Sequence, residues 1–101
     1  MKTIKEVREQ LDKKNLYIVE SEYVEKGEFY ESLTTYDREE ALKEARAIKE
    51  NDDEKEGRRI VVTSYKYDDI TDDAIERWIE SGSEHVEDIY IDNCEAQEEY
   101  I

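Results

Sequence analysis

Apolar residues recur every three or four positions in three segments of the chain, and this spacing predicts three helices. The residue before each segment has a side chain that can cap a helix, and these residues are Thr3, Asp37 and Thr71. The predicted helices cover about 3–14, the segment that follows Asp37, and about 72–81. Gly82 ends the third helix, because glycine readily adopts the left-handed conformation of a C-cap.

Four other segments are rich in Val, Ile and Tyr and predict strands. Leu16 to Val24 and Glu28 to Tyr36 flank the turn Glu25-Lys26-Gly27, so they predict a β-hairpin. The third strand, at about 59–67, has apolar residues on both faces and is expected inside the sheet. The fourth is expected at 86–93.

The hairpin has two possible registers, and charge favours one of them. A two-residue loop would place two glutamates opposite each other, which costs free energy. A three-residue loop with Gly27 in the left-handed conformation pairs Val19 with Leu33 and Tyr23 with Phe29. We therefore expect the second register.

The order of these elements, α-β-β-α-β-α-β, predicts an α+β fold. We expect one small domain at 1–94, with about four mostly antiparallel strands and with helices packed chiefly on one face of the sheet. Residues 95–101 are expected to form an acidic, mobile tail.

Composition adds an expectation about the compartment. The N-terminal residues contain no apolar run, so we expect neither a signal peptide nor a membrane span. The single cysteine, Cys94, cannot form an internal disulfide and fits a reducing compartment. These observations predict a cytoplasmic protein that does not bind membranes.

Charge is distributed unevenly along the chain. The net charge is −15, and residues 68–101 contain thirteen acidic residues but only one basic residue, Arg77. On the third predicted helix, Asp72, Glu76 and Glu80 recur every fourth residue and share one flank. Like charges held this way repel one another, so a surface of a single sign is a plausible functional feature.

The last predicted strand extends this acidic surface. Alternation places Ile89 and Ile91 on its inner face, with Asp88, Tyr90 and Asp92 facing outward. An outward tyrosine between two carboxylates could anchor a partner. The predicted partner-binding residues are Asp68, Asp69, Asp72, Asp73, Glu76, Glu80, Asp88, Tyr90 and Asp92.

Catalysis and cofactor binding have little support in the sequence. His85 and Cys94 stand at opposite ends of the last predicted strand, too far apart to act as a base and its nucleophile. The chain has no glycine-rich phosphate loop, and the aspartates at 68–73 lack the spacing of a calcium loop. We therefore expect no enzyme activity, no cofactor and no metal.

An acidic face attracts basic partners, and in its most specific form it replaces the phosphates of a nucleic acid in a Lys/Arg-lined groove. Direct binding to nucleic acid is not expected, because the net charge repels its backbone. In size and composition the chain resembles the small acidic inhibitors of phages and mobile elements, such as anti-restriction and anti-CRISPR proteins. This resemblance implies an inhibitor of a basic, nucleic-acid-binding protein.

Two alternatives remain open. The acids could be a solvated surface that only keeps the protein soluble. Seven of the eight tyrosines lie in or beside predicted strands, so the protein could instead be a small structural or regulatory protein that self-associates through this sheet, for example as a homodimer.

Overall fold

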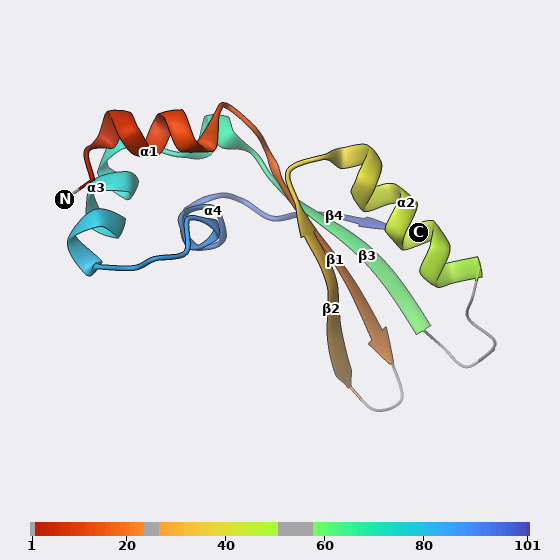
Figure 1. The fold of residues 1–101 in the computed structure, drawn as a ribbon. Coiled ribbons are helices and arrows are strands. Elements are labelled where there is room, and N and C mark those ends of the chain that lie inside the picture. Colours follow the sequence, from red (N-terminus) through yellow and green to blue (C-terminus); the bar gives the residue numbers. More distant parts are fainter. Residues whose placement is uncertain (1, 24–26, 51–57) are drawn as a thin grey trace. The chain divides into compact units, whose positions relative to one another are not determined.

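The computed structural model describes residues 2–23, 27–50 and 58–101 and has the predicted α+β fold (Figure 1). In chain order its elements are α1 (Ile4–Leu11), β1 (Leu16–Tyr23), β2 (Glu28–Thr35), α2 (Arg38–Glu50), β3 (Arg58–Tyr65), the short 3₁₀ helix η1 (Tyr67–Asp69), α3 (Asp72–Ser81), α4 (Glu87–Asn93) and β4 (Gln97–Tyr100). They form two compact units. The helical unit contains residues up to Leu16 and 65–96, and the sheet unit contains 17–64 and 97–101.

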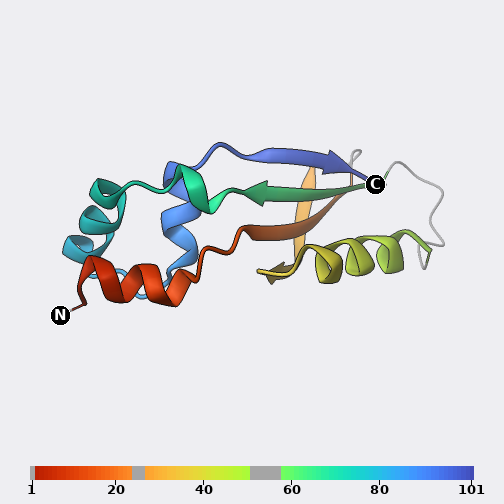
Figure 2. The same cartoon turned by 90° about the horizontal axis from the view of Figure 1, so that it is seen from above.

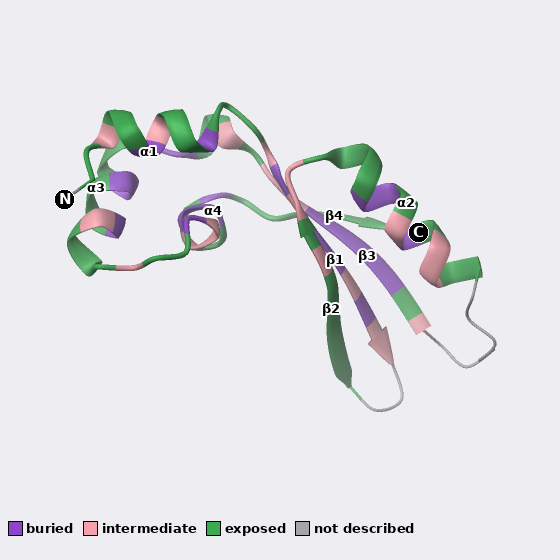
Figure 3. Ribbon diagram, viewed as in Figure 1, coloured by how far each residue is buried: buried purple, intermediate pink, exposed green. Residues whose placement is uncertain are grey.

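The sheet unit is a four-stranded antiparallel sheet with one helix packed against it. The strand order is β2-β1-β3-β4, so β3 lies in the interior as predicted. Helix α2 runs along one face of the sheet (Figure 2). Its predicted apolar stripe packs against β1 and β3 in a core that contains Val19, Ala41, Leu42, Ala45, Ile60 and Val62. Strand β2, at the edge, is mostly exposed (Figure 3).

The hairpin register agrees with the prediction at one end only. Val19 pairs with Leu33 as expected, but Tyr23 pairs with Glu28 instead of Phe29. A register shift between Val19 and Glu20 causes the difference, because β2 has one more residue than β1 at this point. Gly27 has the expected left-handed conformation (φ 63°), whereas the turn residues 24–26 lie outside the described residues.

The prediction of a last strand at 86–93 is wrong, because Glu87–Asn93 forms helix α4. The buried residues of this segment are Val86, Ile89, Tyr90 and Cys94, a helical spacing of three, one and four positions. Ile91, which the alternation placed in the core, is 46% exposed. Over so short a segment the same residues fit both the strand period of two and the helical period of 3.6. The helix buries more of the apolar side chains than the strand would.

The expectation of a mobile tail is also wrong. Residues 97–100 form β4, which pairs with β3 and supplies the fourth strand of the sheet. The backbone N–H of Ile101 continues this pairing by donating to the carbonyl oxygen of Ile60 at 2.9 Å. Because β3 is buried on both faces, its outer backbone edge needs hydrogen-bond partners, and the tail provides them.

Helix α3 of the helical unit begins and ends where the sequence predicted. The side chain of Thr71 accepts a hydrogen bond from the backbone N–H of Ala74 at 3.1 Å, and Gly82 has φ 71° as the left-handed C-cap. Helix α1 is shorter than predicted because the chain turns left-handed at Asp12. Within the part of the chain that the structure describes, no helix has the length and apolar character needed to cross a membrane.

Candidate partner-binding surface

One flank of α3 carries exposed carboxylates. Asp73, Glu76 and Glu80, which we call the α3 flank, are exposed and project from the side of the helix opposite its buried residues Ala74 and Trp78. Along a helix, residues four apart are separated by about 6 Å, so the charges remain close to one another. Among the described residues, no lysine or arginine forms an ion pair with any of these three side chains.

Asp72 does not belong to this open flank, although the sequence placed it there. Arg8 of α1 donates to Asp72 Oδ1 from Nε at 3.0 Å and from Nη2 at 2.7 Å. A further hydrogen bond from Nη2 to the carbonyl oxygen of Ile70, at 3.0 Å, holds the guanidinium in place. The hydrogen bond to Asp72 is the main reason that the pKa of Arg8 is raised. A basic residue from outside the segment 68–101 therefore neutralises one of the predicted acids.

Asp68 and Asp69 lie in η1, the short turn of 3₁₀ helix that precedes α3, and both are exposed. Burial raises the pKa of the nearby Cys94 thiol, and the charge of Asp69 raises it further. The thiol donates to the carbonyl oxygen of Lys66 at 3.3 Å. These two aspartates add negative charge beside the start of α3, but they do not continue its flank.

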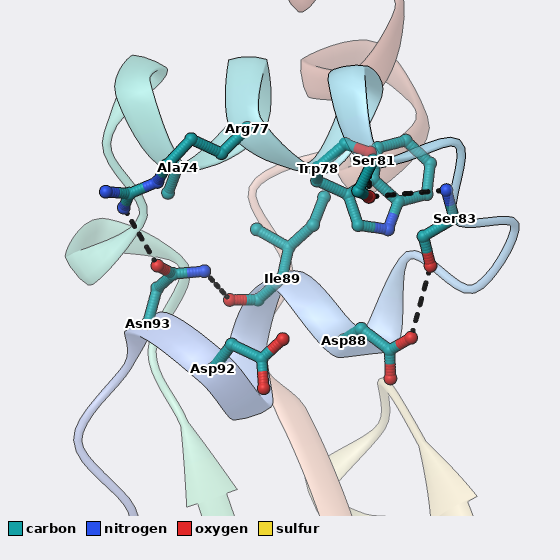
Figure 4. A pocket seen from close by; sticks show the side chains of 9 residues that line it. All are labelled: Ala74, Arg77, Trp78, Ser81, Ser83, Asp88, Ile89, Asp92 and Asn93. Atoms are coloured by element: carbon teal, nitrogen blue, oxygen red, sulfur yellow. Dashed lines mark hydrogen bonds between the residues drawn. The ribbon is translucent and has the colours of Figure 1, made fainter.

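Asp88 and Asp92 lie one turn apart on α4, so the helix brings them to one face, as the predicted strand also would. They line a cavity of about 230 Å³ between α3 and α4, together with Trp78, Ser81 and Ser83 (Figure 4). Asp88 is half-buried and accepts a hydrogen bond from Ser83 Oγ at 3.3 Å. Asp92 is exposed.

Arg77 also lines this cavity, and its guanidinium is turned toward α4 (Figure 4). Its Nη2 donates to Asn93 Oδ1 at 3.3 Å, and Asn93 in turn donates to the carbonyl oxygen of Ile89 at 2.8 Å. Among the described residues, Arg77 forms no ion pair with either aspartate of the cavity. The cavity therefore has an acidic side, formed by Asp88 and Asp92, and a basic side.

Tyr90 is not part of any surface, and its prediction as a partner contact is wrong. Its side chain is 0% exposed, and its hydroxyl donates to the backbone carbonyl oxygen of Lys14 at 2.6 Å. The error follows from the strand prediction. On a helix, Tyr90 shares its face with Val86 and Ile89 and no longer lies between Asp88 and Asp92.

The predicted site therefore divides into two groups around α3. The α3 flank is on one side of the helix, whereas the residues that face the cavity and α4 lie on another. Successive residues are rotated by about 100° around a helix, so Glu76 and Glu80 point well away from Ser81. A partner that contacts both groups must reach around α3.

The sequence did not predict a third group of acids, which lies on the sheet unit. The register shift places Glu20 directly opposite Glu31, on the face of β1 away from Val19 and the α2 core. Burial raises the pKa of Glu20, and the charges of Glu31 and Glu98 raise it further. No local pattern could reveal this pair, because the shift depends on the three-dimensional hairpin.

Large aromatic side chains are also exposed on the sheet unit. Phe29 on β2 and Tyr100 on β4 are 62% and 58% exposed, and Tyr30 on β2 is 49% exposed. The hydroxyls of Tyr30 and Tyr100 donate to Glu28 and Glu98, at 2.7 Å and 2.9 Å. These hydrogen bonds raise the pKa of both phenols.

Histidine, cysteine and carboxylate side chains do not gather into a metal-binding group of three or more in the described parts of the chain. Cys94 is buried, and its thiol donates a hydrogen bond to the backbone carbonyl oxygen of Lys66. His85 is exposed, and its backbone carbonyl oxygen accepts a hydrogen bond from the indole N–H of Trp78. Comparison of the chain with protein-family models, curated proteins and solved structures gives no match.

Proposed function

We propose that this chain is a non-enzymatic binding protein whose acidic helical unit inhibits a basic, nucleic-acid-binding protein by occupying the groove meant for nucleic acid. The observation that carries this proposal is the α3 flank: Asp73, Glu76 and Glu80 are exposed, share one side of a helix and form no ion pair with the described basic residues. We expect it to act in the cytoplasm, where the thiol of Cys94 stays reduced.

The positions of nearby basic residues support a functional flank over a merely solvated one. The helical unit contains seven basic residues against fourteen acidic ones. Three of these basic residues have other partners. Arg8 forms an ion pair with Asp72, and Lys14 Nζ lies 3.9 Å from Asp12 Oδ2. The ammonium group of Lys2 lies over the ring of Trp78. Like-charged neighbours on a helix destabilise it by a few tenths of a kcal/mol per pair. A neutralised flank would avoid this cost, and the chain leaves the flank charged.

Mimicry of a nucleic acid gives these carboxylates a specific role. Proteins hold the backbones of nucleic acids mainly through Lys and Arg contacts to phosphate oxygens. Carboxylates fixed on a helix can occupy the positions of these phosphates and attract the same Lys and Arg side chains. The compositional resemblance to anti-restriction and anti-CRISPR inhibitors of phages and mobile elements supports this form of the proposal.

The test compares two variants that have equal net charge. One carries Asp73→Asn, Glu76→Gln and Glu80→Gln on the α3 flank. The other carries Glu39→Gln, Glu44→Gln and Glu50→Gln on α2 of the sheet unit. The native chain is used to capture proteins from nuclease-treated lysate of the source cell, and each captured protein is then tested for release of labelled DNA or RNA by all three forms. Circular dichroism checks that the forms are folded.

The proposal expects the native chain and the α2 variant to displace nucleic acid equally well. The α3-flank variant should be weaker by roughly three- to 150-fold, because three exposed charge pairs are worth about 0.2–1 kcal/mol each. The competition should also weaken as salt is added. Equal competition by both variants would show that net charge alone is responsible, and failure of the native chain to displace nucleic acid would end the mimicry proposal.

Self-association through the sheet is a second candidate, favoured by the exposure of Phe29 and Tyr100 on the two edge strands. Exposed strand edges and aromatic side chains are typical contacts between copies of a chain. Sedimentation velocity of the native chain and of Phe29→Ser tests it. A dimer that persists in high salt and dissociates in the variant would favour this function, whereas a monomer at all salt concentrations would exclude it.

A further inference from the structure

The cavity between α3 and α4 has the chemistry of a receptor for one basic side chain. Its acidic side consists of Asp88 and Asp92, and Ser83 Oγ donates to Asp88 at 3.3 Å and helps to orient its carboxylate (Figure 4). Ile89 and Trp78 add apolar surface to the wall. The carboxylates alone would indicate only a solvated acidic surface, but the cavity beside them gives a long side chain a place to bury its stem.

Arginine fits this arrangement better than lysine does. A guanidinium presents five N–H donors in a planar fork and can bond to two carboxylates at once, whereas an ammonium group is a compact point charge. Asp88 and Asp92 are separated by one helical turn, about 6 Å along the axis, which the fork can span. The volume of about 230 Å³ leaves room for one side chain and some water, and not for a folded element.

Arg77 limits the affinity of this site for a cation without filling it. Its guanidinium is held by Asn93 at 3.3 Å, on the basic side of the cavity. It repels an incoming guanidinium, so its removal should strengthen binding.

We propose that the α3–α4 cavity receives an arginine side chain of the partner, with Asp88 and Asp92 binding the guanidinium and the apolar wall covering its methylene stem. This inference rests on the proposed function, because it names a feature of the basic partner that the acidic surface attracts. It assigns Asp88 and Asp92 the role of selecting arginine, while the α3 flank provides attraction over a wider area.

The chain's only tryptophan reports on this cavity directly. N-acetyl-arginine methylamide is titrated into the native chain at constant ionic strength, and the emission of Trp78 is followed. We expect a saturable change with a dissociation constant on the order of 1 mM, since a single side chain makes few contacts. The equivalent blocked lysine should bind more weakly. Blocked citrulline, which has nearly the same shape as arginine but no charge, should not bind.

Three variants locate the response. Asp92→Asn should weaken binding of the arginine probe by about five- to tenfold, the loss expected for a charge-assisted hydrogen bond in a half-open site. Glu9→Gln, the matched control, makes the same change in charge at an exposed position on α1 and should leave the affinity unchanged. Arg77→Gln should tighten binding by about two- to fivefold. Backbone amide shifts of Ser83 and Asp92 in ¹H–¹⁵N spectra give a readout that does not depend on tryptophan emission.

The proposal is overturned if neither emission nor amide shifts show saturation with the arginine probe. It is also overturned if citrulline binds equally well, or if Glu9→Gln weakens binding as much as Asp92→Asn does. These outcomes differ from failure of the proposed function. Displacement of nucleic acid through the α3 flank can occur without an arginine receptor, and a functioning receptor can exist on a chain that displaces no nucleic acid.

Discussion

Replacing Glu20 with glutamine should stabilise the sheet unit. Glu20 lies directly opposite Glu31, and burial together with the charges of Glu31 and Glu98 raises its pKa. Like charges opposite each other on antiparallel strands destabilise the pair by roughly 0.2–1 kcal/mol relative to neutral residues. For a chain of about 100 residues, removing this repulsion corresponds to a rise of roughly 1–8 °C in the melting temperature.

The pH dependence of this gain follows from the direction of the pKa shift. Because the pKa of Glu20 is higher in the folded than in the unfolded chain, the folded state retains the proton to a higher pH. The stability that this proton provides is fully present below the unfolded pKa and is lost as pH rises through the folded pKa. Glutamine does not titrate. The gain from Glu20→Gln should therefore be complete at pH 7 and shrink toward zero below about pH 4.

Urea unfolding followed by far-UV circular dichroism measures this effect at both pH values. The set comprises the native chain, Glu20→Gln, Glu31→Gln and the double variant. The second substitution should add less than the first, because the repulsion between Glu20 and Glu31 is already gone. A loss of stability with Glu20→Gln at pH 7, or full additivity in the double variant, would refute the cross-strand argument.

Three further variants test the helical unit. Thr71→Ala removes the N-cap of α3 and should lower the free energy of unfolding by about 1 kcal/mol in urea titrations, whereas Thr71→Ser should retain most of it. Tyr90→Phe deletes the hydrogen bond to the carbonyl of Lys14 and should cost roughly 1–2 kcal/mol in the same assay, with no change in partner binding. Arg8→Gln leaves Asp72 without its ion-pair partner, so the variant should displace nucleic acid from the partner more effectively than the native chain does. Its free energy of unfolding should change by at most about 1 kcal/mol. Weaker displacement would contradict the acidic-surface proposal.

Local signals in the sequence were sufficient for the helices that have clear ends. For α3 the cap at Thr71, the buried face and the C-cap at Gly82 all point to the same ten residues, and the structure has them as predicted. The same holds for the apolar stripe of α2, where Asp37 accepts from the backbone N–H of Glu39 at 3.0 Å. Agreement among independent local preferences makes such elements readable from one sequence.

Helix α4 shows where this approach fails. Its seven residues are too few to distinguish a period of two from one of 3.6, and Ile89 and Ile91 fit the strand pattern. The deciding fact is tertiary: the helical unit has room for Tyr90, whose hydroxyl reaches the carbonyl of Lys14 across 76 residues of sequence. Because this segment was predicted to be a strand, Tyr90 was wrongly predicted to be exposed, and the strand that follows was not predicted.

The exposure of the candidate acids was predicted correctly for the α3 flank, whereas the burial of Tyr90 and the ion pair of Asp72 were missed. All the predicted acids are in the helical unit, and Asp73, Glu76 and Glu80 are exposed as expected. The partner of Asp72 could not be read from the sequence, because Arg8 is 64 residues away. Only the folded chain shows which carboxylates are already paired.

Charge counted along the sequence is therefore a poor guide to the charge of a surface. The acidic C-terminal third contributes Glu98 and Glu99 to the sheet, and in the helical unit its remaining acids are joined by the basic residues of the first sixteen positions. What sets the α3 flank apart from the acids of α2 is the shortage of basic neighbours. Helix α3 carries one basic residue, Arg77, whose guanidinium is held by Asn93, whereas α2 carries two lysines and two arginines among its acids. If the acids served only solubility, any three neutralised carboxylates would have the same effect. A partner that fits the flank must distinguish α3 from α2. Two variants of equal charge can therefore separate partner binding from a role in solubility.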